Sequence, residues 1–212
     1  MKTRVKLCGV TSLEDARLCA DAGAWAIGMI FAEESPRRVD AADAAEIGAA
    51  MRRRVEVAGV FVNTPLDEVV ELADLCSLTM VQLHGEEGPT YCAEVAHRTG
   101  LKVIKAARVR DKASVQALRA FRVAVDFHLL DAFAGGARGG TGQTFDWELV
   151  NSRGAGPPII LSGGITPENA AEAIAAVRPF AIDSASGTEA SPGVKDPAKV
   201  TALVGHASLA AA

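Results

Sequence analysis

The sequence has 212 residues and a formal net charge of −4 at pH 7, which gives no electrostatic reason to expect nucleic-acid binding. Hydrophobic residues make up 49% of it in short runs, enough to bury a substantial core, and no run approaches the roughly 20 apolar residues of a membrane-spanning helix. Residues 1–4 lead directly into a strand pattern, without the apolar region of a secretory signal. We therefore expect a cytoplasmic protein with no membrane partner.

Four cysteines, Cys8, Cys19, Cys76 and Cys92, have neither CxxC spacing nor a nearby pair of histidines. This pattern argues against structural zinc and against a compact disulfide framework. We expect free thiols in a reducing compartment and no metal site.

Hydrophobic period and turn residues predict eight strands that alternate with eight helices. The expected strands cover residues 4–10, 26–31, 56–62, 80–84, 102–106, 127–131, 158–162 and 181–184, and the expected helices cover residues 12–22, 41–53, 66–75, 89–98, 112–122, 145–151, 167–177 and 197–206. Capping hydroxyls at Ser12, Thr64 and Thr166 mark helix starts, and Gly23 and Gly100 mark helix ends.

This strict alternation predicts parallel strands with right-handed crossovers, and eight units are the number that closes a (β/α)8 TIM barrel. Each unit averages about 26 residues, against roughly 30 in a typical barrel, so we expect one minimal α/β barrel domain over residues 1–212. The alternative is a doubly wound open sheet. That fold usually carries a glycine-rich fingerprint after its first strand, where this chain has only Cys8-Gly9-Val10-Thr11.

Polar residues stand at the carboxyl ends of the predicted strands, where barrels of this kind carry their chemistry. Cys8 ends the first strand and Asp131 the sixth, and together they supply one candidate base and one candidate acid for proton transfer at a sugar carbon. Taken alone, the cysteine would be a packing residue and the aspartate a turn cap. A free thiol has a pKa of about 8.5, and Lys6 on the same strand face is a candidate source of the positive charge that a thiolate needs.

Two glycine turns, Gly163-Gly164 and Ser186-Gly187, follow the seventh and eighth strands. Backbone N–H groups exposed in such turns make the usual phosphate site of these barrels. Arg37 follows the second strand, where its planar fork could grip a substrate carboxylate, whereas we expect Arg38 on the surface.

Three further polar residues are expected on the wall of the same site: Gln82 and His84 on the fourth strand, and Asp183 at the end of the eighth. His84 is interpreted as a hydrogen-bonded wall residue in preference to a proton carrier. The loop after Asp131 ends in Gly139-Gly140-Thr141-Gly142, which suits close backbone approach to a ligand. Trp25 and Trp147 are interpreted as packing residues.

Short motifs follow one another along nearly the whole chain: Lys6-Leu7-Cys8-Gly9-Val10-Thr11, Ser35-Pro36-Arg37, Gly59-Val60-Phe61-Val62-Asn63, Val81-Gln82-Leu83-His84-Gly85, Leu129-Leu130-Asp131, Gly139-Gly140-Thr141-Gly142 with Phe145-Asp146-Trp147, Leu161-Ser162-Gly163-Gly164, and Ser186-Gly187 with Pro192-Gly193-Val194-Lys195-Asp196. In this order and spacing they resemble the phosphoribosylanthranilate isomerase family. The resemblance implies a cofactor-free (β/α)8 barrel that converts N-(5-phosphoribosyl)anthranilate into 1-(2-carboxyphenylamino)-1-deoxyribulose 5-phosphate in tryptophan biosynthesis, by an Amadori rearrangement.

Carried over by position, the resemblance makes Asp131 the general acid that opens the furanose ring and Cys8 the general base that removes the C2′ proton. Arg37 matches the residue that faces the anthranilate carboxylate, and the two glycine turns match the phosphate site. The chain departs from the family pattern at residues 182–187, where Ser184 replaces an apolar residue and Ala185 replaces a serine. Trp25 stands where the family often has a small acidic residue.

Two other functions fit the sequence. One is another sugar-phosphate barrel, such as an epimerase or a bifunctional relative that acts on a histidine-pathway aminoaldose, although Arg37 favours a substrate that carries a carboxylate. The other is a non-catalytic phosphate-binding barrel, against which the intact Cys8 and Asp131 argue. The expected partner is a phosphorylated small molecule, and the chain is expected to be a monomer or a homodimer.

Overall fold

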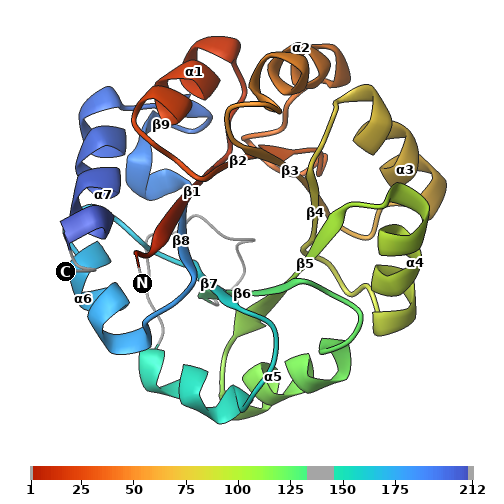
Figure 1. The fold of residues 1–212 in the computed structure, drawn as a ribbon, viewed down its shortest axis with the longest axis vertical. Helices are drawn as coiled ribbons and strands as arrows, with labels where there is room; N and C mark the ends of the chain where they lie inside the picture. The colour runs from red at the N-terminus through yellow and green to blue at the C-terminus, as the bar shows by residue number, and fades with distance from the viewer. Residues whose placement is uncertain (1, 133–145, 210–212) are drawn as a thin grey trace.

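A computed structural model describes residues 2–132 and 146–209. Eight parallel strands close into one barrel in the order of the sequence (Figure 1). They are β1 (Arg4–Cys8), β2 (Ala26–Ile30), β3 (Glu56–Phe61), β4 (Met80–Leu83), β5 (Lys102–Val109), β6 (Phe127–Ala132), β7 (Ile159–Leu161) and β8 (Ala181–Ser184). The barrel closes where β1 pairs in parallel with β8. The predicted (β/α)8 barrel is confirmed, and the open sheet is excluded because such a sheet would leave β1 and β8 unpaired.

Helices surround the barrel on all sides (Figure 1). The α-helices are α1 (Leu13–Asp21), α2 (Ala41–Met51), α3 (Leu66–Leu75), α4 (Pro89–Thr99), α5 (Lys112–Ala117), α6 (Ala170–Val177) and α7 (Pro197–Leu209), and the 3₁₀ helices are η1 (Leu118–Phe121), η2 (Trp147–Arg153) and η3 (Ser186–Thr188). The α-helix predicted at residues 145–151 is wrong: η2 takes its place, and residue 145 lies outside the described part. The segment is short and ends in Asn, Ser, Arg and Gly, which support a 3₁₀ turn better than a longer α-helix.

The predicted helix signals have mixed outcomes. Ser12 caps α1 by accepting a hydrogen bond from the Asp15 backbone at 3.1 Å, and Gly23 and Gly100 take left-handed φ values of 93° and 67° at helix ends. Thr64 does not cap α3, whose N-cap is Pro65. Helix α6 begins three residues later than predicted, because residues 167–169 form a turn instead.

The core has an inner and an outer layer. Apolar residues from alternating strand positions, such as Ala26, Met80 and Leu129, fill the barrel, and a second set packs between the strands and the helices. At the amino end of the barrel the Trp25 ring lies edge-on to Phe127 and Phe180, with centroids 5.8 and 5.2 Å apart. The packing role predicted for Trp25 is therefore confirmed.

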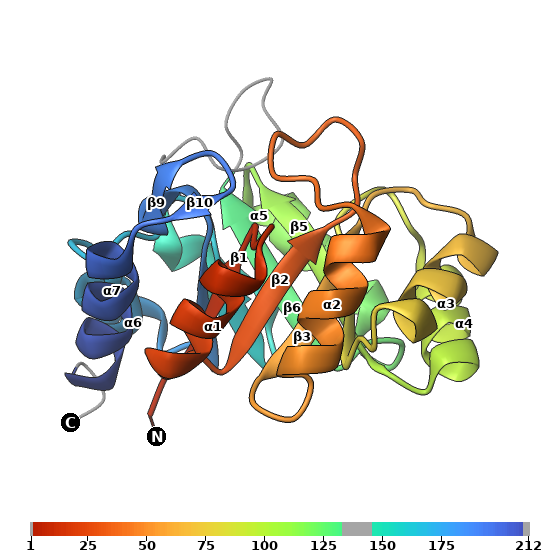
Figure 2. The same ribbon diagram turned by 90° about the horizontal axis from the view of Figure 1, so that it is seen from above.

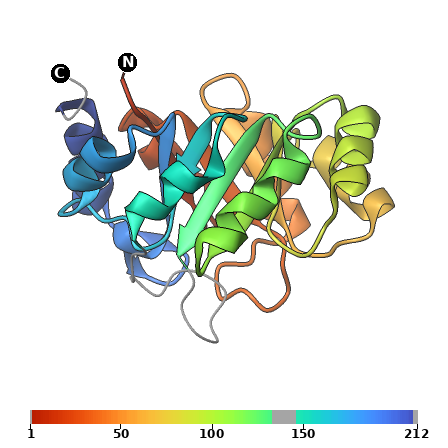
Figure 3. The same ribbon diagram turned by 90° about the horizontal axis from the view of Figure 1, so that it is seen from below.

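A hairpin that the sequence did not predict follows β8. Its strands β9 (Glu189–Ser191) and β10 (Val194–Lys195) pair antiparallel and rise at the same end of the barrel as the loop between β2 and α2 (Figures 2 and 3). The start of β1 and the end of α7 lie at the opposite end (Figure 2). Across the described ranges, every helix is too short or too polar to cross a membrane.

Candidate active site

A cavity of about 510 Å³ opens at the carboxyl end of the strands. Apart from Gly187, every residue that the sequence predicts for the site lines it: Cys8, Arg37, Gln82, His84, Asp131, Gly163, Gly164, Asp183 and Ser186. Residues from six of the eight βα units thus meet in one chamber. The predicted loop Gly139-Gly140-Thr141-Gly142 lies outside the described residues.

At the floor of the cavity, Cys8 is 5% exposed and shares its strand face with the fully buried Lys6. Lys6 Nζ pairs with Asp183 Oδ1 across the β1–β8 seam at 2.9 Å, and Ser162 Oγ donates to the other oxygen of Asp183 at 3.3 Å. Although burial opposes the charged ammonium, the pKa of Lys6 lies above its usual value, and the Asp183 carboxylate is the largest cause that raises it. The lysine is therefore a cation already matched by a carboxylate.

Burial is the largest influence on the protonation state of the Cys8 thiol. Burial raises the pKa of Cys8, and the negative charge of Asp183 adds to that effect, while Lys6 and Lys195 act in the opposite direction without overcoming it. In the free protein Cys8 is therefore a neutral thiol at neutral pH.

Gly28 makes room for this arrangement. It lies opposite Cys8 in the β1–β2 register, and a Cβ at Gly28 would lie 2.7 Å from Cys8 Sγ and 3.2 Å from Lys6 Nζ. The sequence reasoning missed Gly28, although a glycine inside a strand is itself a signal of close approach by another group.

Asp131 occupies the opposite wall, at the end of β6, and is 4% exposed. His84 Nε2 lies 3.3 Å from Asp131 Oδ2, and Gln82 Nε2 lies 3.3 Å from His84 Nδ1. Gln82, His84 and Asp131 therefore form a chain of polar contacts, in which the Gln82 amide fixes the imidazole and the imidazole faces the carboxyl group.

Arg108 is a cation at this wall that was not predicted from the sequence. It lies opposite Asp131 in the β5–β6 register and lines the cavity. Its Nε is buried and has no hydrogen-bond partner within residues 2–132 and 146–209. No turn or motif marks Arg108 in the sequence, and only the alternation of inward and outward positions along β5 could have indicated it.

The glycine turn after β7 has the geometry that a phosphate site needs. Gly163 and Gly164 have φ values of 85° and 67°, in the left-handed region where glycine carries no steric cost. Asn169 braces the turn, because its side chain accepts from Thr166 N at 2.9 Å and donates to Gly164 O at 2.8 Å. In the described chain neither glycine N–H donates to a protein acceptor, so both are available to an anion.

The turn after β8 packs directly against the first turn. A Cβ at Gly187 would lie 2.1 Å from Ile165 O, which explains why a glycine stands there and why it lies behind the cavity wall. Ser184 Oγ donates to the same carbonyl at 2.6 Å. The departure from the family pattern at Ser184 thus adds a tie between the two turns, while Ala185 presents no hydroxyl to the cavity.

Arg37 reaches the cavity from the β2–α2 loop. Its Nε and Nη2 hold the carboxylate of Glu189 at 2.8 to 3.0 Å, and the two side chains are only 12% and 3% exposed. Arg38 is exposed, as predicted. In the described part of the chain no three His, Cys, Asp or Glu side chains are arranged to hold a metal ion.

Comparisons with known proteins agree on one family. The sequence profile of N-(5'phosphoribosyl)anthranilate (PRA) isomerase matches residues 5–206. The N-(5'-phosphoribosyl)anthranilate isomerase of Geobacter metallireducens is 47% identical over 204 residues, which cover 96% of this chain and 98% of that protein. The phosphoribosyl anthranilate isomerase of Thermotoga maritima is 38% identical, with a TM-score of 0.90 over 97% of this chain and 98% of that one.

A further crystal structure, of phosphoribosyl anthranilate isomerase in complex with reduced 1-(o-carboxyphenylamino)-1-deoxyribulose 5-phosphate, is 37% identical. Its TM-score is 0.86, and the match covers 97% of this chain and 98% of that one. The profile spans nearly the whole chain, and the full-length relative is well above 30% identical. The chain therefore belongs to the phosphoribosylanthranilate isomerase family.

Proposed function

We propose that this chain is the phosphoribosylanthranilate isomerase of tryptophan biosynthesis and that Cys8 and Asp131 carry the reaction. The observation that carries the proposal is the meeting of four groups in one cavity: a thiol, a carboxyl group on the opposite wall, an arginine fork and a left-handed glycine turn. A substrate with a carboxylate at one end, a phosphate at the other and a sugar carbon between them matches these groups.

In the first step Asp131 gives its proton to the furanose ring oxygen. The bond from C1′ to that oxygen breaks, its electron pair stays on the oxygen, and the nitrogen lone pair forms a C1′=N iminium. His84, 3.3 Å from Asp131 Oδ2, orients the carboxyl group and accommodates the negative charge that remains after transfer.

In the second step the Cys8 thiolate removes the proton from C2′. The electron pair of that C–H bond forms C1′=C2′, and the iminium electrons return to nitrogen. Protonation at C1′ and loss of the C2′ hydroxyl proton then give the ketone, so the reaction neither gains nor loses an atom. Because the iminium is itself the electron sink, this mechanism needs no cofactor.

The raised pKa of the resting thiol fits this sequence of steps. Lys6 is already matched by Asp183, and burial keeps Cys8 protonated in the free protein. The iminium brings a new positive charge beside Sγ, which favours loss of the thiol proton to solvent and so formation of the thiolate that takes the C2′ proton. We propose that Cys8 becomes an effective base only after Asp131 has opened the ring.

The remaining residues bind substrate. Gly163, Gly164 and Ser186 form the phosphate subsite, with Gly187 packed behind it, and backbone N–H groups carry the affinity where Ala185 offers no hydroxyl. Arg37 takes the anthranilate carboxylate. Gln82, His84 and Asp183 line the cavity between the acid and the base, where the sugar hydroxyls would lie. We place the enzyme in the cytoplasm as a single barrel domain, acting alone or as a homodimer.

The test is the loss of phosphoribosylanthranilate fluorescence when purified protein is added, with the product identified by mass spectrometry. We expect catalytic turnover to the carboxyphenylamino-deoxyribulose phosphate, and at most weak turnover of the histidine-pathway aminoaldose, which has no carboxylate for Arg37. Preferred turnover of the aminoaldose would favour the bifunctional relative. Tight binding of either compound without product would indicate a non-catalytic barrel and contradict the proposal.

A further inference from the structure

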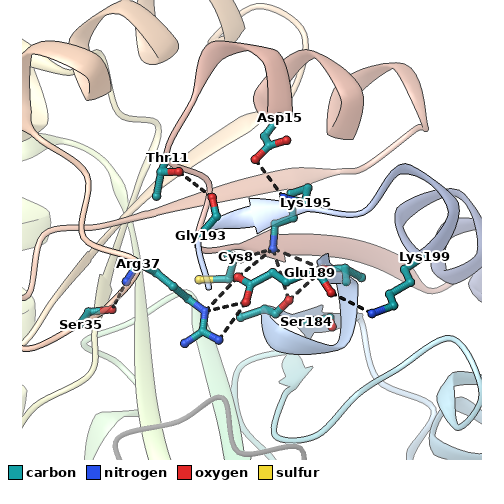
Figure 4. A network of polar contacts seen from close by, with 12 residues as sticks. Cys8, Thr11, Asp15, Ser35, Arg37, Ser184, Glu189, Gly193, Lys195 and Lys199 are labelled. Carbon is teal, nitrogen blue, oxygen red and sulfur yellow. Dashed lines mark hydrogen bonds and ion pairs between the residues drawn. The ribbon is translucent and has the colours of Figure 1, made fainter. Parts of the chain in front are cut away.

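The β9–β10 hairpin holds two buried charged residues that the proposed mechanism does not use. Glu189 begins β9, and its side chain is 3% exposed; Lys195 ends β10, and its side chain is fully buried. Burying an ion is costly unless it is paired and hydrogen-bonded. Glu189 meets this condition through Arg37 and Lys195, and Lys195 meets it through Glu189, Thr188 and the backbone of Cys8 and Ala185 (Figure 4).

Glu189 determines which edge of Arg37 faces the cavity. Arg37 Nε lies 2.9 and 3.0 Å from the two Glu189 oxygens, and Nη2 lies 2.8 Å from Oε2. A guanidinium has five N–H donors in a fixed fork. With Nε and one N–H of Nη2 engaged, the end-on edge formed by Nη1 and Nη2 is left to bind a second carboxylate.

Gly9 lets Arg37 and Glu189 lie against β1, the strand that carries Cys8. A Cβ at Gly9 would come within 2.8 Å of Arg37 Cδ and 3.2 Å of Glu189 Oε1. The glycine that follows Cys8 therefore has a physical reason: Arg37 and Glu189 pack across it, directly above the end of β1.

Lys195 ties Glu189 to the catalytic strand and to the phosphate turn. Its Nζ donates to Cys8 O at 2.7 Å and to Ala185 O at 3.3 Å, and it lies 3.5 Å from Glu189 Oε1. Lys195 is itself held in place, because its backbone N–H donates to Asp15 at 3.0 Å. The Lys195 ammonium group thus contacts the backbone carbonyl of Cys8, the backbone carbonyl of Ala185 after β8 and the carboxylate of Glu189, which aligns Arg37.

The charges of Arg37, Glu189 and Lys195 also favour the binding of an anion. Arg37 and Lys195 contribute two positive charges and Glu189 one negative charge, so the group keeps a net positive charge for an incoming anion. Without Glu189, two cations would lie close together, and the Arg37 fork would have no fixed orientation.

We propose that Glu189 and Lys195 are positioning residues of the isomerase: Glu189 presents the open edge of Arg37 to the substrate carboxylate, and Lys195 locks that orientation to the base strand and the phosphate turn. This inference rests on the proposed roles of Cys8 and Arg37. It goes beyond them by assigning selectivity for the carboxylate to a residue that does not touch the substrate.

The test compares two substrates, N-(5-phosphoribosyl)anthranilate and N-(5-phosphoribosyl)aniline, which lacks the carboxylate. For Glu189→Gln we expect kcat/KM for the anthranilate compound to fall by about tenfold or more, the range for loss of a charge-assisted hydrogen bond. Turnover of the aniline compound should change only a few-fold. The selectivity ratio between the two should therefore collapse toward that of Arg37→Met.

Glu87→Gln is the matched control. Glu87 also belongs to a buried pair, with Lys105 Nζ at 2.6 Å, but it holds no residue that faces the substrate carboxylate. We expect Glu87→Gln to lower the unfolding temperature and to leave the selectivity ratio unchanged. An unchanged ratio in folded Glu189→Gln would overturn the proposal, whereas absence of turnover in the unmodified protein would overturn the proposed function instead.

Lys195→Met tests the second half of the proposal. We expect kcat to fall for both substrates, because Cys8 O loses its anchor, and competitive inhibition by inorganic phosphate to weaken, because Ala185 O loses the same anchor. A variant that loses stability but keeps both kcat and phosphate inhibition would show that Lys195 is merely structural.

Discussion

Cys8 shows what a single strand position can and cannot reveal. The alternation of faces along β1 predicts that Lys6 and Cys8 point the same way, and this is how they lie. The partner that neutralises Lys6, however, is Asp183, which is 177 residues further along the chain. The sequence therefore suggests that Lys6 could stabilise a thiolate at Cys8. Only the closed barrel shows that Asp183 already pairs with Lys6.

The raised pKa of Cys8 leads to a measurable pH dependence. Since the thiolate is the form that reacts with iodoacetamide, its fraction should grow about tenfold per pH unit from about pH 7 to about pH 9. Peptide mass spectrometry of the free protein should show the alkylation rate of Cys8 rising in the same way. Cys19 and Cys92 are internal controls, because both are fully buried and neither lines the cavity, and both should stay unmodified. A Cys8 rate that is already flat at pH 7 would mean a resting thiolate.

The residues that sequence reasoning missed share a property: their chemistry depends on neighbours from distant strands. Arg108 is an arginine in an ordinary apolar strand until β6 places Asp131 beside it. Glu189 and Lys195 lie in or beside a motif that supports the family resemblance, yet nothing local shows that they meet Arg37 and Cys8. By contrast, His84 and Asp131 could be found because each stands at the carboxyl end of a strand, and Arg37 because it lies in the loop that follows β2.

At the scale of elements, the strands are easier to predict than the turns that join them. Buried parallel strands are mostly apolar, so short apolar runs bounded by turn residues indicate β1 to β8 even where a run contains a charged residue. The hairpin β9–β10 has strands of three and two residues, too short to show any period. Helix α6 starts later than its sequence signals predict because Asn169, and not Thr166, organises the turn before it.

The turn after β7 should control substrate affinity more than catalysis. In Gly164→Ala the new side chain must occupy a left-handed φ of 67°, at a cost of roughly 1–2 kcal/mol, and the backbone N–H groups should move away from the phosphate. We expect KM for phosphoribosylanthranilate to rise several-fold, with little change in kcat, in steady-state kinetics.

Gly100→Ala is the control for strain alone. Gly100 has the same φ of 67°, and a Cβ at this position would meet no other atom within 4 Å, but it ends α4, away from the cavity. A similar loss of stability with an unchanged KM is expected. If both variants raised KM equally, the turn after β7 would have no special part in phosphate binding.

For the whole molecule, the strict alternation of eight strands with eight helices predicts a closed barrel. Strand, helix and turn signals all favour this same structure. Apolar runs, capped amphipathic helices and short glycine turns recur about every 26 residues. The details that deviate, such as the 3₁₀ helix η2, lie in the outer layer and leave barrel closure intact.

Stability and activity should therefore be separable in this barrel. Gly48 in α2 packs against the end of α3, and a Cβ there would lie 1.8 Å from Cys76 O. We expect Gly48→Ala to cost about 1–3 kcal/mol, which lowers the unfolding temperature by about 2–4 °C per kcal/mol, while folded protein keeps its kcat. Gly205→Ala in α7 has open space around it and should instead stabilise slightly. Thermal unfolding followed by circular dichroism measures both, and a large loss of kcat in Gly48→Ala would contradict the separation.

The proposed chemistry is tested most directly by the turnover of phosphoribosylanthranilate in Cys8→Ala and Asp131→Asn, measured beside the unmodified protein by loss of substrate fluorescence. Both side chains are small, buried at the cavity wall and outside the apolar clusters, so both variants should fold. We expect each to lose several orders of magnitude in kcat, and the double variant to lose little more, because the acid and the base act on one substrate in sequence. Near-normal turnover in either folded variant would contradict the assignment of Cys8 as base and Asp131 as acid.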